Sequence, residues 1–128
     1  MGKRINYASD SKWEGIVGYS RAVKIGNLIE IAGTTAVEHG NIVGKGDPYE
    51  QSVFIFKKIE KTLHDLGAKM SDVVRTRTYT TDISNWQKIG KAHAEFFKNI
   101  KPAATMVEVK SLIDKDLLVE IEVTAVVQ

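Results

Sequence analysis

Cysteine is absent from this 128-residue sequence, and proline occurs only twice. Without cysteine the chain cannot form disulfides, use a thiol nucleophile, or hold zinc or iron–sulfur centres through thiolates. No segment approaches the roughly 18 consecutive apolar residues of a membrane-spanning helix, and the first residues contain no apolar core of signal-peptide length. We therefore expect a cytoplasmic protein without a membrane partner.

An excess of one charge is also lacking, because 18 basic side chains are balanced by 16 acidic ones and the net charge is +2. The lysines are interleaved with acidic residues, as in FKKIEKTLHDLGAKMSD, rather than gathered in one block. This pattern is typical of a solvated helix face and gives no reason to expect a nucleic-acid partner.

Familiar catalytic and metal-binding motifs are missing as well. The sequence contains no Gly-x-Ser-x-Gly, Walker or Gly-x-Gly-x-x-Gly motif. His39, His64 and His93 lie far apart; we expect the first in a turn and the other two on helix surfaces. We therefore expect no metal site.

The composition that is present is that of a globular protein, with 43% apolar and 27% charged residues. A chain of this length buries about two-thirds of its unfolded surface, which suffices for one core. We therefore expect a single domain that comprises residues 1–128.

The first half of the sequence predicts a hairpin and then a helix. Strand-like segments 18–23 and 28–33 flank a tight turn at Gly26-Asn27. A polar stretch with turn signals leaves room for one further short strand. Asp47-Pro48-Tyr49-Glu50 then supplies an N-cap, a proline at the first helical position and a capping-box glutamate. The helix should end at Gly67 and bury one face formed by Ile55, Ile59, Leu63 and Leu66.

Residues 73–81 alternate with a period of two, which indicates a strand. One face of this strand carries Arg75, Arg77 and Tyr79, and the other carries Val74, Thr76, Thr78 and Thr80. A capping box that starts at Ser84 predicts a second helix. The side chains that this helix turns inward are Ile89, Ala92 and Phe96, with Phe97 beside them.

Two final strands are expected at 105–109 and 117–127. In the last strand, alternate residues from Leu117 to Ala125 are apolar, while Glu120 and Glu122 lie on the other face. The element order is therefore β-β-(β)-α-β-α-β-β. This order predicts an α+β fold: a two-layer sandwich with a mixed sheet and two helices on one face. The second, charged face could meet water or form a subunit interface with satisfied cross-strand ion pairs. We favour the interface, because antiparallel α+β domains with one helix-covered face often associate through the other.

Four sequence blocks resemble one known family. They are GYSRAVKIGNLIEIAG, DLGAKMSDVVRTRTYTTDI, HAEFF and KPAATMVEVKSLIDKDLLVEIEVTAVV, and together they run from about Gly18 to Val127. In order, spacing and character they are similar to the YjgF/RidA family of reactive-intermediate enamine/imine deaminases, which also carries the label endoribonuclease L-PSP.

The resemblance implies a chorismate-mutase-like fold and a homotrimer with small-molecule clefts between neighbouring subunits. Active members hydrolyse 2-aminoacrylate and related enamines or imines to a 2-keto acid and ammonia, without a metal or organic cofactor. An arginine binds the substrate carboxylate, a glutamate and backbone groups position the attacking water, and a tyrosine lines the cleft.

Carried over by position, the catalytic glutamate and tyrosine correspond to Glu120 and Tyr19, and a substrate-binding backbone position corresponds to Gly33. The family arginine corresponds to Ala104, because the chain has Pro-Ala-Ala where active members have Pro-Ala-Arg. Thr105, the next residue, is expected to line the floor of the same cleft.

The missing arginine leaves the substrate open. Arg21 is the first candidate to replace it, because we expect it to share a strand face with Tyr19. Arg75 and Arg77 are alternatives, but ion pairs with Glu120 and Glu122 would make them unavailable to a substrate. An asparagine common in the family's second helix is replaced by Gly90.

Three functions follow from the resemblance. The first is an enamine or imine deaminase with altered substrate choice. The second is a non-catalytic trimer that binds or responds to a small molecule. The third, a ribonuclease or translation inhibitor, ranks last because the sequence offers neither a histidine pair nor a basic patch for RNA cleavage.

Overall fold

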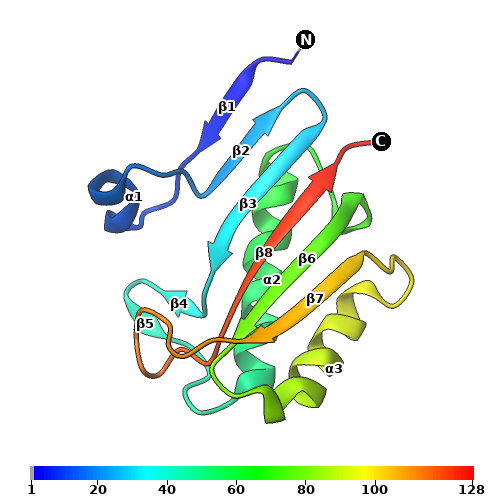
Figure 1. The fold of residues 1–128 in the computed structure, drawn as a ribbon. Helices are drawn as coiled ribbons and strands as arrows, with labels where there is room; N and C mark the ends of the chain where they lie inside the picture. Colours follow the sequence, from blue (N-terminus) through cyan, green and yellow to red (C-terminus); the bar gives the residue numbers. More distant parts are fainter. Residues whose placement is uncertain (1) are drawn as a thin grey trace.

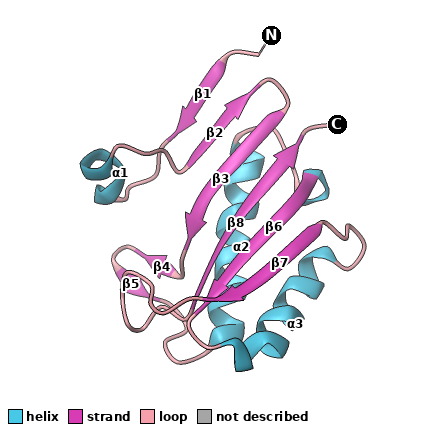
Figure 2. Cartoon of the chain, viewed as in Figure 1, coloured by secondary structure: helices cyan, strands magenta, loops and turns pink. Residues whose placement is uncertain are grey.

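A computed structural model describes residues 2–128 and shows a six-stranded mixed sheet covered on one side by two helices (Figures 1 and 2). The strand order is β1-β2-β3-β8-β6-β7, and β4 and β5 form a separate small hairpin. This arrangement confirms the expected α+β fold. The elements are β1 Arg4–Tyr7, α1 Lys12–Val17, β2 Ala22–Ile25, β3 Leu28–Thr34, β4 Val37–Glu38, β5 Asn41–Ile42, α2 Pro48–Asp65, β6 Val73–Thr80, α3 Trp86–Phe97, β7 Ala103–Glu108 and β8 Val119–Val126.

The expected hairpin is formed by β2 and β3. Ile25 pairs with Leu28, so only two residues make the turn, and Gly26 adopts a φ of 58° that favours glycine. The strand itself begins at Ala22 and is shorter than expected, because residues 18–21 form a loop.

Helix α2 begins at the predicted N-cap, but the Asp47 backbone N–H donates to the Gly44 carbonyl oxygen at 2.8 Å rather than to the Glu50 side chain, so the capping box is only half formed. The Asp47 carboxylate accepts the Glu50 backbone N–H at 3.0 Å, and Pro48 occupies the first helical position. The helix buries Ile55, Ile59 and Leu63 completely against the sheet, as predicted from their spacing. Gly67, with a φ of 80°, ends it.

Strands β6 and β7 are parallel and are joined through α3, as a parallel pair requires. β8 runs antiparallel between β3 and β6 and begins at Val119, later than the expected 117. Its alternate residues from Val119 to Ala125 are buried as predicted, and so is Leu117 just before it. The face of Val74 was predicted wrongly. A bulge between Val73 and Arg75 turns Val73 into the core and leaves Val74 exposed.

The start of the second helix also differs from its prediction. The capping residue is Asp82 rather than the predicted Ser84. The Asp82 carboxylate accepts the Ser84 backbone N–H at 3.0 Å and caps a short 3₁₀ turn that precedes α3. Within α3 the fully buried aromatic residue is Phe97, and Phe96 lies at the edge of the core. The helical period therefore predicted the buried face of α3 correctly, but it put Phe96 rather than Phe97 at the centre of that face.

Two elements near the N-terminus were not predicted. β1 pairs with β2 at the edge of the sheet, and α1 lies beyond the end of β1 and the start of β2 (Figure 1). α1 is held by its own buried Glu14, whose carboxylate accepts the Ser9 N–H at 3.0 Å. Its apolar residues are largely exposed: Trp13, Ile16 and Val17.

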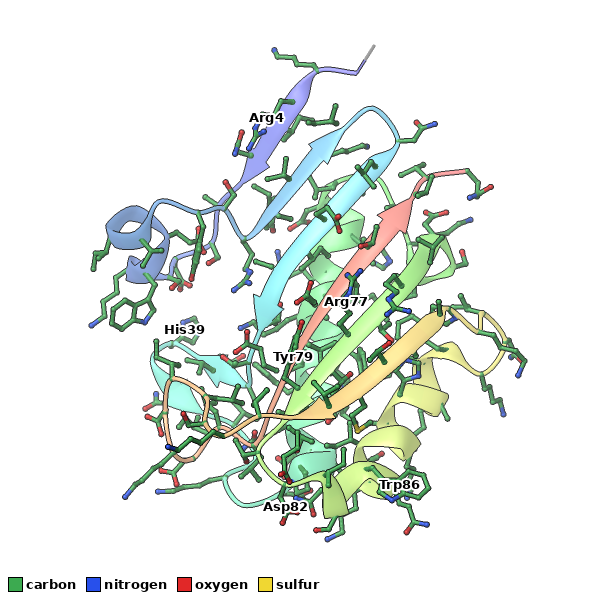
Figure 3. All side chains as sticks on the ribbon, in the orientation of Figure 1. Arg4, His39, Arg77, Tyr79, Asp82 and Trp86 are labelled. Atoms are coloured by element: carbon green, nitrogen blue, oxygen red, sulfur yellow. The ribbon has the colours of Figure 1, made fainter. Side chains whose placement is uncertain are left out.

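The sheet has two chemically different faces. One is covered by α2 and α3 and receives Thr76, Thr78 and Thr80 among its apolar side chains. The other, here called the open face, has no helix of the described chain over most of its area and carries Arg77 and Tyr79 (Figure 3). No helix within residues 2–128 is long and apolar enough to cross a membrane.

Candidate functional site

Glu120 of β8 and Gly33 near the end of β3 lie in very close contact. A Cβ placed on Gly33 would lie 2.9 Å from the Glu120 Cδ and closer still to its Oε2. Real Cβ atoms do not occupy such positions, so the carboxyl group occupies space that only glycine leaves. A register shift between Ile31 and Thr34 brings this part of β3 out of the regular ladder.

The Glu120 carboxyl group is half-buried on the open face. Burial raises its pKa above the ordinary value; nearby Arg21 lowers the pKa in part, and Glu122 raises it further. Among the residues that the structure describes, its oxygens have neither a hydrogen-bond partner nor an ion pair. A carboxylate in this setting can accept a proton or bind a cationic group.

Arg21 lies in the loop before β2, so the expectation that it shares a strand face with Tyr19 was wrong. Its guanidinium donates to the Gly33 carbonyl oxygen. Its Nε is buried and has no partner within residues 2–128. Desolvation lowers the pKa of Arg21, while Tyr19, Glu14 and Glu120 act in the opposite direction. Arg21 therefore fixes the strand end that carries Gly33.

Tyr19 follows the left-handed Gly18 that ends α1, and its backbone N–H donates to the Glu14 carbonyl at 3.1 Å. The residue is 38% exposed. It lines a hollow of about 770 Å³ between α1 and the open face of β1, β2, β3 and β8. We call this the open-face hollow. Its other lining residues are Arg4, Asn6, Glu14, Gly15, Gly18, Ser20, Val23, Glu30, Ile31, Ala32 and Glu122.

The two arginines of β6 form ion pairs or hydrogen bonds with residues other than Glu120. Arg77 forms an ion pair with Glu122 at 3.6 Å, and the Tyr79 hydroxyl donates to the same carboxylate at 2.7 Å. Figure 3 shows Arg77 and Tyr79 together over the middle of the open face. Arg75 donates to the Thr105 hydroxyl at 2.6 Å. The expected pairing of Arg77 with Glu122 is thus present, and neither arginine contacts Glu120 among the described residues.

Ala104 and Thr105 lie on β7, the edge strand, and both are exposed. Ala104 pairs with the buried Thr76, and Thr105 pairs with Arg77. Since laterally paired residues point to the same face, Ala104 faces the helix side and Thr105 the open face. Ala104 and Glu120 therefore lie on different strands and opposite faces, and one chain alone does not bring them together.

His93 was wrongly expected on the surface. It is half-buried against Phe56 and Phe97, and its Nε2 lies 2.9 Å from the hydroxyl of Thr76, the strand partner of Ala104. Burial lowers its pKa. Its spacing of four from both Ile89 and Phe97 is the sequence signal that places it on the buried stripe.

Lys58 is a second residue that sequence reasoning missed. From α2 its Nζ donates to the carbonyl oxygens of Thr35 and Val37, at 3.3 and 3.1 Å. Together with Arg21 on Gly33, it fixes every second carbonyl of the segment 33–37. No group of three metal-ligating side chains occurs within residues 2–128.

Replacing Gly33 by alanine is expected to displace the Glu120 carboxyl group and lower the free energy of unfolding by about 1–3 kcal/mol, the usual cost of overpacking. Urea denaturation of the variant measures this loss. In a Glu120→Ala background the same change should lower the free energy of unfolding much less, because the carboxyl atoms that clash with the new Cβ are absent.

Gly15→Ala is the matched control, since a Cβ at Gly15 meets nothing within 4 Å. An equal loss for Gly33→Ala with and without Glu120 would contradict the close approach of these two residues.

Comparisons with known proteins agree with this architecture. The sequence profile of the family described as Endoribonuclease L-PSP matches residues 10–127. A RutC-family protein of Pyrococcus abyssi is 39% identical over 109 residues, which cover 84% of each chain. An uncharacterised protein of Streptomyces coelicolor is 36% identical over 117 residues, or 91% of this chain and 87% of the other.

Among solved structures, a member of the YjgF/YER057c/UK114 family from Mycobacterium tuberculosis superposes with a TM-score of 0.89 at 46% identity, covering 98% of this chain and all of the other. This likeness confirms the YjgF-type, chorismate-mutase-like fold. The profile match and the relatives confirm the resemblance found in the sequence. The chain therefore belongs to the Endoribonuclease L-PSP family, also called the YjgF/RidA family.

Proposed function

We propose that the chain hydrolyses a reactive enamine or imine to a carbonyl compound and ammonia, with a substrate choice altered by Ala104. The observation that carries the proposal is the half-buried Glu120 carboxyl group, which lies against Gly33 and has a raised pKa. A carboxylate with a pKa moved toward neutrality is suited to general acid–base catalysis. Membership of the family supports the same reaction class.

In the proposed reaction Glu120 takes a proton from water as the water oxygen attacks the imine carbon. The resulting carbinolamine loses ammonia when the proton returns to nitrogen, which completes R₂C=NH₂⁺ + H₂O → R₂C=O + NH₄⁺. Arg21 and Lys58 hold the backbone at 33–37, and with it the position of Gly33 beneath the carboxyl group. The step requires no redox change.

We further propose that the working site is shared between copies in a homotrimer. Glu120, Gly33 and Tyr19 lie on the open-face side of one chain, whereas Ala104 faces the helix side of the edge strand β7. If these family positions form one cleft, β7 of one copy must lie against the Glu120 region of another. The exposed, charged open face and the exposed edge strand are both suited to such contacts.

Glu120→Gln tests the reaction. With an imine generated in situ, the variant should lose about 10²–10⁴-fold in kcat, the usual contribution of general acid–base catalysis. In the wild type, kcat should fall as the pH drops through the raised pKa of Glu120, because the base must be ionised. Both are measured by carbonyl or ammonia release. Unchanged turnover in the variant would exclude Glu120 as the catalytic base.

Thermal unfolding provides the control for folding. A raised pKa means that the ionised Glu120 carboxylate is disfavoured in the folded protein. This destabilisation of the folded protein is therefore fully present above the folded-state pKa and absent below the ordinary pKa of the unfolded chain. Glu120→Gln should therefore have a Tm at pH 7 no lower than that of the wild type, and any gain should vanish in acid. A large fall in Tm would instead indicate a structural role.

A second candidate is a non-catalytic trimer that binds a small molecule at the same place. Ala104 favours it, because the family position that binds the substrate carboxylate carries no charge here. Shifts in Tm across a panel of keto acids and amines, without turnover of any imine, would support this alternative.

Ribonuclease activity ranks third. It is supported by the family's description and by a solved structure from Thermotoga maritima, 25% identical, that is described as a putative endoribonuclease. His39 lies in an exposed turn, His64 on the surface of α2 and His93 against the core, so the described chain offers no histidine pair for RNA cleavage. RNA cleavage that follows the protein through repeated purification would reverse this ranking.

A further inference from the structure

The cationic side chains around the proposed site are already bonded to the protein. Arg21 donates to the Gly33 carbonyl, Arg77 pairs with Glu122, and Arg75 donates to Thr105. Lys58 binds two backbone carbonyls of the 33–37 segment. A substrate carboxylate would have to compete with these bonds for the same cations, because the unpartnered Nε of Arg21 is buried and Ala104 supplies no cation.

Carboxylates outnumber cations on the walls of the open-face hollow. Glu14, Glu30 and Glu122 line it, against the single guanidinium of Arg4. Glu120, Arg21 and the Arg77 that pairs with Glu122 lie next to it, so that four carboxylates face three guanidinium groups in all. An anionic ligand would therefore enter a region of like charge, and a cationic one a region of opposite charge.

Glu120 differs from the other carboxylates in its bonding. Glu14 accepts from Ser9, Glu30 from Thr124, and Glu122 from Tyr79 and Arg77. Glu120, by contrast, has no bonded partner within residues 2–128, and Arg21 is the cation that acts on it. A protonated imine or amine nitrogen would give this carboxylate a charge-assisted hydrogen bond.

We infer that the site takes a cationic imine or amine that bears no carboxylate, and that Glu120 contacts its nitrogen. This inference rests on the proposed function and narrows its substrate to imines of simple aldehydes and ketones. The products are then an aldehyde or ketone and ammonium rather than a 2-keto acid. The class of reaction that supplies such a substrate is the oxidation of a primary amine, which forms the C=N bond.

The test uses two substrates that differ only in the carboxylate. A flavin amine oxidase converts isobutylamine to its aldimine, and an amino-acid oxidase converts valine to the corresponding 2-imino acid. We expect kcat/KM for the aldimine to exceed that for the imino acid at least tenfold. By calorimetry, isobutylamine should bind at least tenfold more tightly than 2-oxoisovalerate, and Glu120→Gln should abolish this preference.

Glu60→Gln, which removes one charge from α2 on the other side of the sheet, is the matched control and should keep the preference. Faster turnover of the imino acid, or tighter binding of the keto acid, overturns the inference and leaves the proposed deaminase standing. Selective binding of isobutylamine without turnover of either imine supports the inference and refutes the deaminase. If neither compound binds, the inference is wrong.

Discussion

Replacing Ala104 by arginine is expected to raise kcat/KM for 2-aminoacrylate by about two to four orders of magnitude. A bidentate arginine–carboxylate contact contributes roughly 3–6 kcal/mol, at about 1.4 kcal/mol for each factor of ten. Ala104 is exposed on an edge strand, so a long side chain can be accommodated without disturbing the core. Ketoacid release from the enamine generated in situ measures the gain.

Ala103→Arg is the matched control for this gain. Ala103 is the preceding residue on β7 and is also exposed, but it pairs with Arg75 and so faces the open side. It adds the same charge to the same strand on the other face. We expect it to leave the rate for 2-aminoacrylate near that of the wild type. Equal gains from both arginines would show a general effect of charge rather than the restoration of a carboxylate-binding position.

The same change bears on the inferred preference for cationic substrates. An arginine at position 104 would add a cation beside the carboxylates of the shared site. Its guanidinium should therefore weaken the binding of isobutylamine while it strengthens the binding of keto acids. Alanine at this position would then determine substrate specificity.

The core elements were predictable because burial leaves a periodic signal. In β8 every second residue is apolar and buried, and in α2 Ile55, Ile59 and Leu63 recur at helical spacing. The N-cap at Asp47 and the turn at Gly26 also follow from residue types, because a carboxylate can accept a free backbone N–H and glycine tolerates a positive φ.

The elements that were missed lack such a signal. β1 is four residues long and mostly exposed at the edge of the sheet, and α1 has only six residues and exposes most of its apolar ones. Val74 shows how a local irregularity defeats a period of two, because a single bulged residue exchanges inside and outside.

The candidate site was predictable in part for a different reason. Tyr19, Gly33 and Glu120 came from the family resemblance, and the structure places the last two in close approach. No spacing rule connects residues 87 positions apart, and none indicated that Lys58 binds the 33–37 carbonyls. Ala104 and Glu120 lie on opposite faces of the sheet, and only the strand register of the structure reveals this.

A mixed oligomer of two inactive variants is expected to regain activity. Glu120→Gln removes the base, and Ala104→Trp should block the opposite wall of the cleft with an indole ring. If each site takes Glu120 from one copy and position 104 from another, co-refolding the two in equal amounts leaves about a quarter of the sites with both native residues. Each variant alone provides no such site.

The rate of imine hydrolysis by this mixture, compared with each variant alone and with the refolded wild type, tests the account most directly. We predict roughly a quarter of the wild-type rate from the mixture and almost none from either variant alone. A mixture as inactive as its components, although size-exclusion chromatography and native mass spectrometry show mixed oligomers, would contradict a catalytic site shared between copies.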